Sequence, residues 1–130
     1  MGIVVGYLAT PEGRAALGAA ADEARMRDVP VVVVVSLRPD ASPDERASLD
    51  AELGKVERKL TKREVAYEIR VRDGGDVADD LISAAEETGA SLIVIGVRRR
   101  SPVGKLILGV NAQRVLFDAP CPVMTVKPTA

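Results

Sequence analysis

The chain of 130 residues is long enough for one domain that buries a core of its own. Aromatic residues make up 2% of the sequence and Trp is absent, so we expect a core of Val, Leu, Ile and Ala. The 18 basic and 19 acidic residues leave a net charge of −1, which argues against a general nucleic-acid binder, and the absence of His removes the commonest general base and metal ligand.

The chain begins with the pattern of a strand followed by a helix. Residues 3–7 form a short, mostly β-branched apolar run, which is typical of a strand buried on both faces. Thr10 is placed to cap a helix whose first residue is Pro11. We expect this helix to reach about Asp28, and its alanine-rich face predicts close packing against a sheet.

A second strand and helix follow. Residues 30–37 contain five consecutive valines and predict another interior strand. Ser42 and Glu45 have the spacing of a capping box around Pro43, where we expect a helix that extends to about residue 62. One apolar stripe runs along this helix at spacings of four, three and four residues, and it consists of Leu49, Leu53, Val56 and Leu60.

The third strand has a different pattern. Over residues 65–71, Val, Tyr, Ile and Val alternate with Ala, Glu and Arg, which predicts a half-exposed strand near a sheet edge. Asp76 is placed to cap a third helix, which we expect to end at Gly89. Residues 91–96, SLIVIG, predict another buried strand.

The end of the chain predicts a helix over residues 112–117 and a strand over residues 123–126. Strands and helices thus alternate throughout, which predicts an α/β fold: one three-layer domain of residues 1–130, with a five-stranded parallel sheet and helices on both faces. If the sheet has the common order 3-2-1-4-5, the order reverses between strands one and four. Ligands of such sheets bind in the crevice at that reversal.

The loop of residues 96–109 lies at this expected crevice and has features that suit an anion. Its glycines let backbone N–H groups approach a phosphate, and a helix N-terminus follows it. The alternative is that its three arginines form a solvated loop tip. From Gly96 onward the chain has one acidic residue, Asp118, and six basic residues: Arg98, Arg99, Arg100, Lys105, Arg114 and Lys127.

Motifs for catalysis are few. We find no nucleophile paired with a base, and no pair of carboxylates in the crevice, so we do not expect a dedicated enzyme. Cys121 lies between two prolines without a basic neighbour and is interpreted as a structural thiol. Asp76, Asp79 and Asp80 are explained by the first turn of a helix, so no metal site is predicted.

Three stretches make the whole chain resemble the universal stress protein family: IVVGYLATPEGRAAL, DVADDLISAAEETGASLIVIG and GKLILGVNAQRVLFDAPCPVMTVK. The resemblance implies a five-stranded parallel sheet between four helices, the fold described as adenine nucleotide alpha hydrolase-like. It also implies a stress-response protein that forms a homodimer through its last strand, here Val123, Met124, Thr125 and Val126.

One branch of this family binds ATP through the pattern Gly, two residues, Gly, nine residues, Gly, then Ser or Thr, with an acid just after strand one. Gly96 and Gly109 match the first and third glycines. Arg99, Val110 and Leu8 stand where the second glycine, the hydroxyl residue and the acid belong. Two hypotheses therefore stay open: a regulator that binds an adenine nucleotide, or a nucleotide-independent dimerisation and partner-interaction module whose ATP motif has degenerated.

The ligand of the first hypothesis is ATP, with Mg²⁺ only if ATP is bound, or AMP or a cyclic nucleotide. We expect no nucleic-acid or membrane partner and a cytoplasmic protein, since residues 1–10 lack a signal-peptide pattern and no apolar run reaches about 20 residues. The candidate nucleotide-binding residues are Tyr7, Leu8, Ala9, Ser36, Leu37, Gly96, Val97, Arg98, Arg99, Gly109, Val110 and Asn111.

Overall fold

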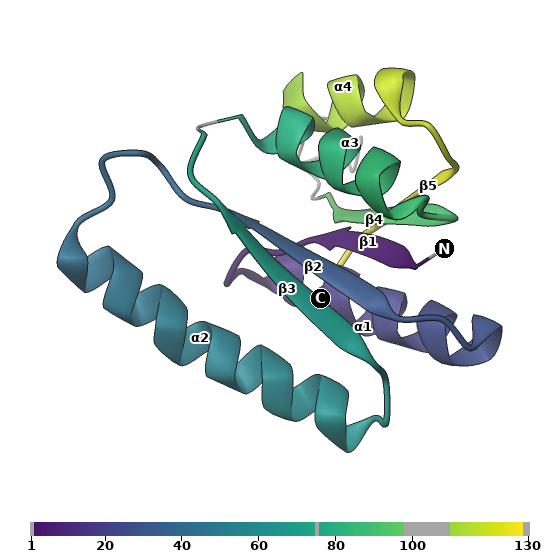
Figure 1. Ribbon diagram of the computed structural model, residues 1–130, viewed down its shortest axis with the longest axis horizontal. Coiled ribbons are helices and arrows are strands. Elements are labelled where there is room, and N and C mark those ends of the chain that lie inside the picture. The colour runs from purple at the N-terminus through teal and green to yellow at the C-terminus, as the bar shows by residue number, and fades with distance from the viewer. Residues whose placement is uncertain (1, 75, 98–109, 129–130) are drawn as a thin grey trace, which may run out of the picture.

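The computed structural model describes residues 2–74, 76–97 and 110–128, and strands and helices alternate along them as predicted (Figure 1). The elements are β1 (Ile3–Gly6), α1 (Pro11–Arg27), β2 (Val31–Ser36), α2 (Pro43–Lys62), β3 (Tyr67–Arg72), α3 (Val77–Thr88), β4 (Leu92–Gly96), α4 (Val110–Asp118) and β5 (Val123–Val126).

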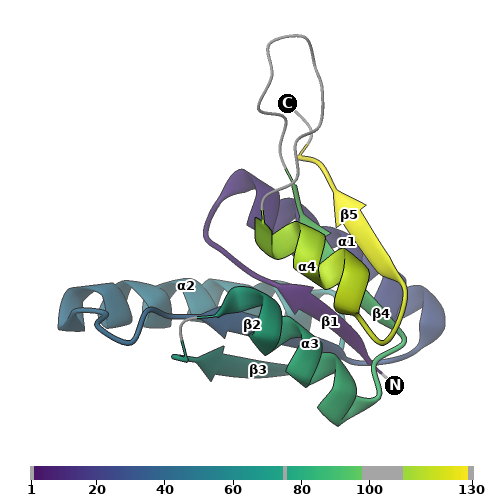
Figure 2. The ribbon, with the colours of Figure 1, turned by 90° about the horizontal axis from the view of Figure 1, so that it is seen from above.

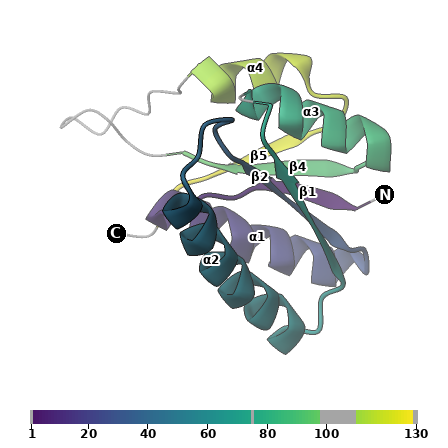
Figure 3. The same cartoon turned by 60° about the vertical axis from the view of Figure 1, so that its left-hand side comes forward.

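The five strands form one parallel sheet in the order β3-β2-β1-β4-β5, which confirms the predicted order. Ile3 of β1 lies level with Val31 on one side and with Leu92 on the other. Helices α1 and α2 cover one face and α3 and α4 cover the other (Figure 3), so the domain has three layers. Seen from above, α3 and α4 lie side by side (Figure 2).

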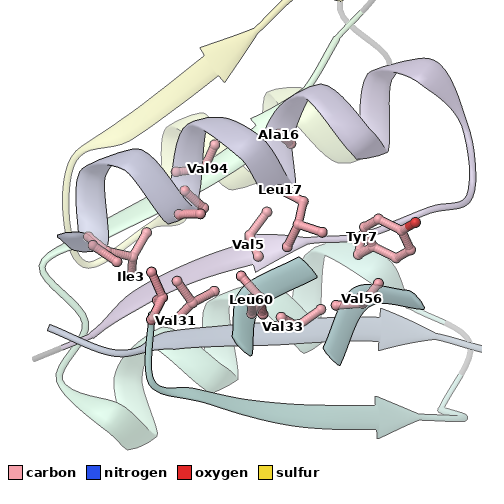
Figure 4. Close-up of a cluster of buried hydrophobic side chains, with 14 of the residues drawn as sticks. Ile3, Val5, Tyr7, Ala16, Leu17, Val31, Val33, Val56, Leu60 and Val94 are labelled. Carbon is pink, nitrogen blue, oxygen red and sulfur yellow. The ribbon is translucent and has the colours of Figure 1, made fainter. Parts of the chain in front are cut away.

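The core is aliphatic on both faces of the sheet, as the composition predicted. Successive strand residues point to opposite faces, so Val5 and Val33 pack under α1 and α2 (Figure 4), while Val4 and Val34 pack under α3 and α4. Two apolar side chains of the predicted stripe on α2, Val56 and Leu60, are buried in the first cluster, and the other two, Leu49 and Leu53, are partly buried against it.

The helix starts agree with the capping residues that the sequence indicated. The side chain of Thr10 accepts a hydrogen bond from the backbone N–H of Gly13, and that of Asp76 accepts one from Asp79. Ser42 and Glu45 form the complete capping box. Helix α4 begins at Val110, two residues earlier than expected.

Strand β3 differs from its expected burial. It lies at the sheet edge as predicted, yet Tyr67 and Val71, expected on the buried face, are 36% and 45% exposed. Tyr67 lines an open groove together with Gly54 and Arg58 of α2. Because α2 presents a glycine and charged side chains there, it covers β3 incompletely and only Ile69 joins the core.

Candidate functional site

A pocket of about 350 Å³ opens at the carboxyl ends of β1 and β4, where the strand order reverses. Parallel sheets bind ligands at this point because the strands on its two sides continue into helices on opposite faces. The described residues that line the pocket are Gly6, Tyr7, Leu8, Thr10, Glu12, Gly13, Val34, Ser36, Val77, Leu81, Ile95, Gly96, Val97, Asn111, Ala112 and Val115.

The structure brings several of the predicted binding residues together in this pocket. Ala9 and Leu37 are not among the lining residues. Arg98, Arg99 and Gly109 lie outside the described residues, and of Val110 only its place at the start of α4 is described. Those that line the pocket are Tyr7, Leu8, Ser36, Gly96, Val97 and Asn111, and their binding role stays a prediction.

Two glycines allow α1 to begin directly beneath the pocket. A Cβ on Gly13 would lie 1.9 Å from the carbonyl oxygen of Leu8, and a Cβ on Gly96 would lie 2.2 Å from that of Glu12. Such distances are far inside van der Waals contact, so any side chain would force the backbones apart. Gly96, which was expected to admit a phosphate, is thus already required for the packing of β4 against α1.

Tyr7 connects the pocket to α2. Its ring is buried, and its hydroxyl donates a hydrogen bond of 2.6 Å to Glu52 Oε1 (Figure 4 shows the hydroxyl at the edge of the cluster). Burial, reinforced by the bond to Glu52, raises the pKa of Tyr7 to about 12, and the same bond lowers the pKa of Glu52. Arg14 of α1 lies 4.0 Å from this carboxylate and adds a cation to the group.

Ser36 connects the pocket to α3 on the opposite face of the sheet. It ends β2, and its Oγ donates a hydrogen bond of 2.7 Å to Asp80 Oδ2. Both side chains are half-buried. The predicted role of Asp80, as an acid in the first turn of α3, is therefore only part of what it does, because it also orients a pocket hydroxyl.

Arg114 of α4 does not add free positive charge to the pocket. Its guanidinium donates to both carboxylate oxygens of Asp76 at 3.0 Å and also contacts Asp79. The backbone N–H of Asp79 and then Arg114 lower the pKa of Asp76, so this carboxylate stays ionised and paired. One of the six basic residues counted toward the predicted anion site thus instead ties α4 to the N-terminus of α3.

Sequence reasoning missed part of the pocket wall. Glu12 is the one charged side chain among the described lining residues, and it follows Leu8, where the family acid was sought, by four positions in the sequence. Val77 and Leu81 of α3 also line the pocket and were not among the predicted residues. The helix pattern of α3 contained a usable signal, because both residues lie on the face that meets the ends of β1 and β2.

Beside the pocket, carboxylate clusters, the single thiol and helix hydropathy bear on other kinds of site. The described residues contain no group of three or more Cys, Asp or Glu side chains arranged to hold a metal ion. Cys121 is half-buried against the second core cluster, and burial raises the pKa of its thiol, which makes a thiolate less accessible. Within the same described part of the chain, no helix is both long and apolar enough to cross a bilayer.

The fold and the pocket define an α/β protein with a pocket at its strand-order reversal. A sequence model of the Universal stress protein family matches residues 1–127. The Universal stress protein of Mycolicibacterium smegmatis is 44% identical over 126 residues, which cover 97% of each chain. The chain belongs to the universal stress protein family, as the three sequence stretches indicated.

Solved structures agree with this assignment. A universal stress protein from Archaeoglobus fulgidus superposes with a TM-score of 0.83 at 36% identity, over 98% of both chains. A universal stress protein from the same organism in complex with dAMP superposes with a TM-score of 0.80 at 29% identity, again over 98% of both chains.

Proposed function

We propose that the chain binds an adenine nucleotide in the pocket between β1 and β4. The observation that carries the proposal is the pocket itself, which joins an apolar wall to a helix N-terminus at the sheet's reversal point. Its volume lies at the lower end of the range of about 300–1,000 Å³ for small-molecule sites, which suits a nucleoside monophosphate. The relative whose structure contains dAMP supports the same ligand class.

The two ends of the pocket suit the two ends of a nucleotide. Val34, Val77 and Leu81 form an apolar wall beside Ser36, which favours a flat base. Asn111 and Ala112 line the pocket from the first turn of α4, where the backbone N–H groups and the helix dipole favour a phosphate.

Glu12 suits the sugar that joins base and phosphate. It is half-buried on the first turn of α1, and its carboxylate oxygens can accept hydrogen bonds from ribose hydroxyls. This is the chemistry that the family acid supplies and that Leu8 cannot. Leu8 itself is 60% exposed and lines the rim of the pocket.

The more specific proposal is that the bound nucleotide is ATP. Its additional phosphates would extend toward the loop after β4, and Mg²⁺ would accompany them. Because the described residues offer no metal cluster, the ion would be held mainly by the phosphates and water.

Two measurements test the proposal. Denatured protein should release a compound that absorbs at 260 nm and has the mass of an adenine nucleotide, and the chain's own absorbance interferes little because it lacks Trp. Nucleotide-free protein should produce heat when titrated with AMP, dAMP, or ATP and Mg²⁺. If none of the three ligands produces heat at about 1 mM, binding with a Kd of about 1 mM or tighter is excluded. That result would favour the interaction-module hypothesis.

We also infer that two copies pair through β5. The strand lies at the sheet edge, so within residues 2–74, 76–97 and 110–128 one side of it has no partner strand. Three of its side chains, Val123, Met124 and Val126, are only partly buried. Pairing with a second copy of β5 would cover this edge.

A further inference from the structure

We propose that Ser36, held by Asp80, makes the pocket select a purine with an amino group at position 6 over one with a keto oxygen there. The inference rests on the proposed function and assigns the base specificity of the same pocket to one hydroxyl and its carboxylate partner. What it adds to the ligand class is the pair of side chains that distinguishes AMP from IMP, two nucleotides that share sugar, phosphate and ring shape.

Ser36 and an apolar wall line the same pocket. Val34 lies two residues before Ser36 on β2, and Val77 and Leu81 line the pocket from α3. A purine ring that buries its faces against these side chains can present its polar edge to the only hydroxyl among them. Thr10, the other serine or threonine in the described pocket wall, uses its oxygen to cap α1.

The hydrogen of the Ser36 hydroxyl is already committed. In the 2.7 Å contact the Ser36 hydroxyl donates and Asp80 Oδ2 accepts. A hydroxyl has a single hydrogen and two lone pairs. Toward the pocket, Ser36 therefore presents lone pairs only and acts as an acceptor.

An acceptor discriminates between the two kinds of purine. The 6-amino group of adenine donates hydrogen bonds, whereas the 6-keto oxygen of hypoxanthine or guanine accepts them. Adenine can satisfy Ser36, but a keto purine would place two acceptors face to face and lose a hydrogen bond to water without replacement. Sites built around one hydrogen bond reject ligands that cannot make it for this reason.

The first test needs no substitution. Nucleotide-free protein is titrated calorimetrically with AMP, with IMP, and with purine riboside monophosphate, which has hydrogen at position 6. We expect AMP to bind about tenfold more tightly than IMP, with purine riboside monophosphate in between.

Substitutions then separate Ser36 from Asp80. Ser36→Ala should lower the affinity for AMP and raise that for IMP, because it removes both the acceptor for the amino group and the acceptor that faces the keto oxygen. Asp80→Ala frees the hydroxyl hydrogen to turn toward the pocket, so the affinity for IMP should rise and the preference for AMP should fall several-fold. Asp50→Ala removes an equal charge from the exposed side of α2 and should leave the AMP-to-IMP ratio as in the wild type. A general structural effect of Asp80→Ala would weaken both ligands together and would not move this ratio.

The outcomes distinguish the inferred base specificity from the proposed nucleotide binding on which it rests. Equal affinity of the wild type for AMP and IMP would overturn the specificity inference and leave nucleotide binding standing. A preference that survives in both Ser36→Ala and Asp80→Ala would also overturn it. If neither AMP nor IMP binds, the proposed function fails and the inference fails with it.

Discussion

Tyr7 and Glu52 lie 45 residues apart in the chain, and the hydroxyl of one donates to the carboxylate of the other across 2.6 Å. Tyr7 follows β1 at the edge of the candidate pocket, while Glu52 lies midway along α2. Few side chains of α2 are buried against the sheet, and this bond links α2 directly to the wall of the candidate pocket. Its energetic role can be measured separately from ligand binding.

Replacement of Tyr7 by Phe should destabilise the protein by about 1 kcal/mol, since it removes one hydrogen bond while keeping the buried ring. The effect should depend on pH. A group whose pKa is raised in the folded state, here from 10.0 to about 12, contributes stability that is complete below the unfolded pKa and is lost as pH rises toward the folded value. Urea unfolding should thus show the wild-type advantage shrinking between pH 10 and about 12.

The contribution of Glu52 to stability depends on pH in the opposite direction. The pKa of Glu52 is lowered mainly by the bond from Tyr7, so its contribution is present above the unfolded pKa and is lost as pH falls through the folded value. A difference between wild type and Tyr7→Phe that is constant from acid to alkaline pH would contradict this account of the pair.

An alanine substitution should have opposite effects on stability at Gly13, beneath the pocket, and at Gly18, elsewhere on α1. Gly13→Ala should destabilise the protein by about 2 kcal/mol or more, because its Cβ would overlap the carbonyl oxygen of Leu8. Gly18→Ala, on the same helix, places its Cβ 4.0 Å from Lys59 Nζ and should stabilise the protein by about 0.5–1 kcal/mol. Thermal unfolding of the two variants measures both signs, and equal effects would refute the close approach at Gly13.

Removal of the Arg114 guanidinium should loosen α4 from α3. We expect Arg114→Gln to lower the melting temperature, since Asp76 and Asp79 lose their common cation. The side chains are partly exposed, so salt should screen the interaction and reduce the difference from the wild type. Melting curves in low and high salt test this, and a difference that grows with salt would exclude an ionic origin.

The proposed dimer can be disrupted at Thr125 without breaking the sheet. The carbonyl oxygens of Pro122 and Val126 accept hydrogen bonds from β4, so the alternate N–H of Thr125 faces the free edge of β5. Thr125→Pro should convert a dimer to a monomer in light scattering, because proline removes that donor. Thr125→Val retains the N–H and should remain dimeric, and a dimer that persists with proline would locate the interface elsewhere.

Much of the fold followed from local patterns. The five valines of β2 and the glycine-terminated run of β4 can only be interior strands, and alternation with capped helices left a parallel sheet as the simplest arrangement. The pairing of Arg114 with Asp76 could not be predicted, because residues 38 positions apart meet only through the packing of α4 on α3. The exposure of Tyr67 depends likewise on which side chains of α2 lie opposite it.

The sequence predicted the position of the candidate site better than it predicted the residues that line it. The reversal of strand order located it, and six of the predicted residues line it. Glu12 escaped notice because the first turn of α1 was interpreted only as a helix start. The steric demand on Gly96 was equally hidden, since its crowding comes from a carbonyl that lies 84 positions earlier in the chain.

Calorimetric titration of a blocked pocket tests the central claim most directly. Val77 lines the pocket and is 37% exposed, so Val77→Trp can place an indole in the pocket without overpacking the core. Met26 is exposed on α1 away from the pocket, and Met26→Trp is the matched control. We predict that AMP produces binding heat with the wild type and with Met26→Trp but not with Val77→Trp; equal heat from all three proteins, or none from the wild type, would contradict a nucleotide site between β1 and β4.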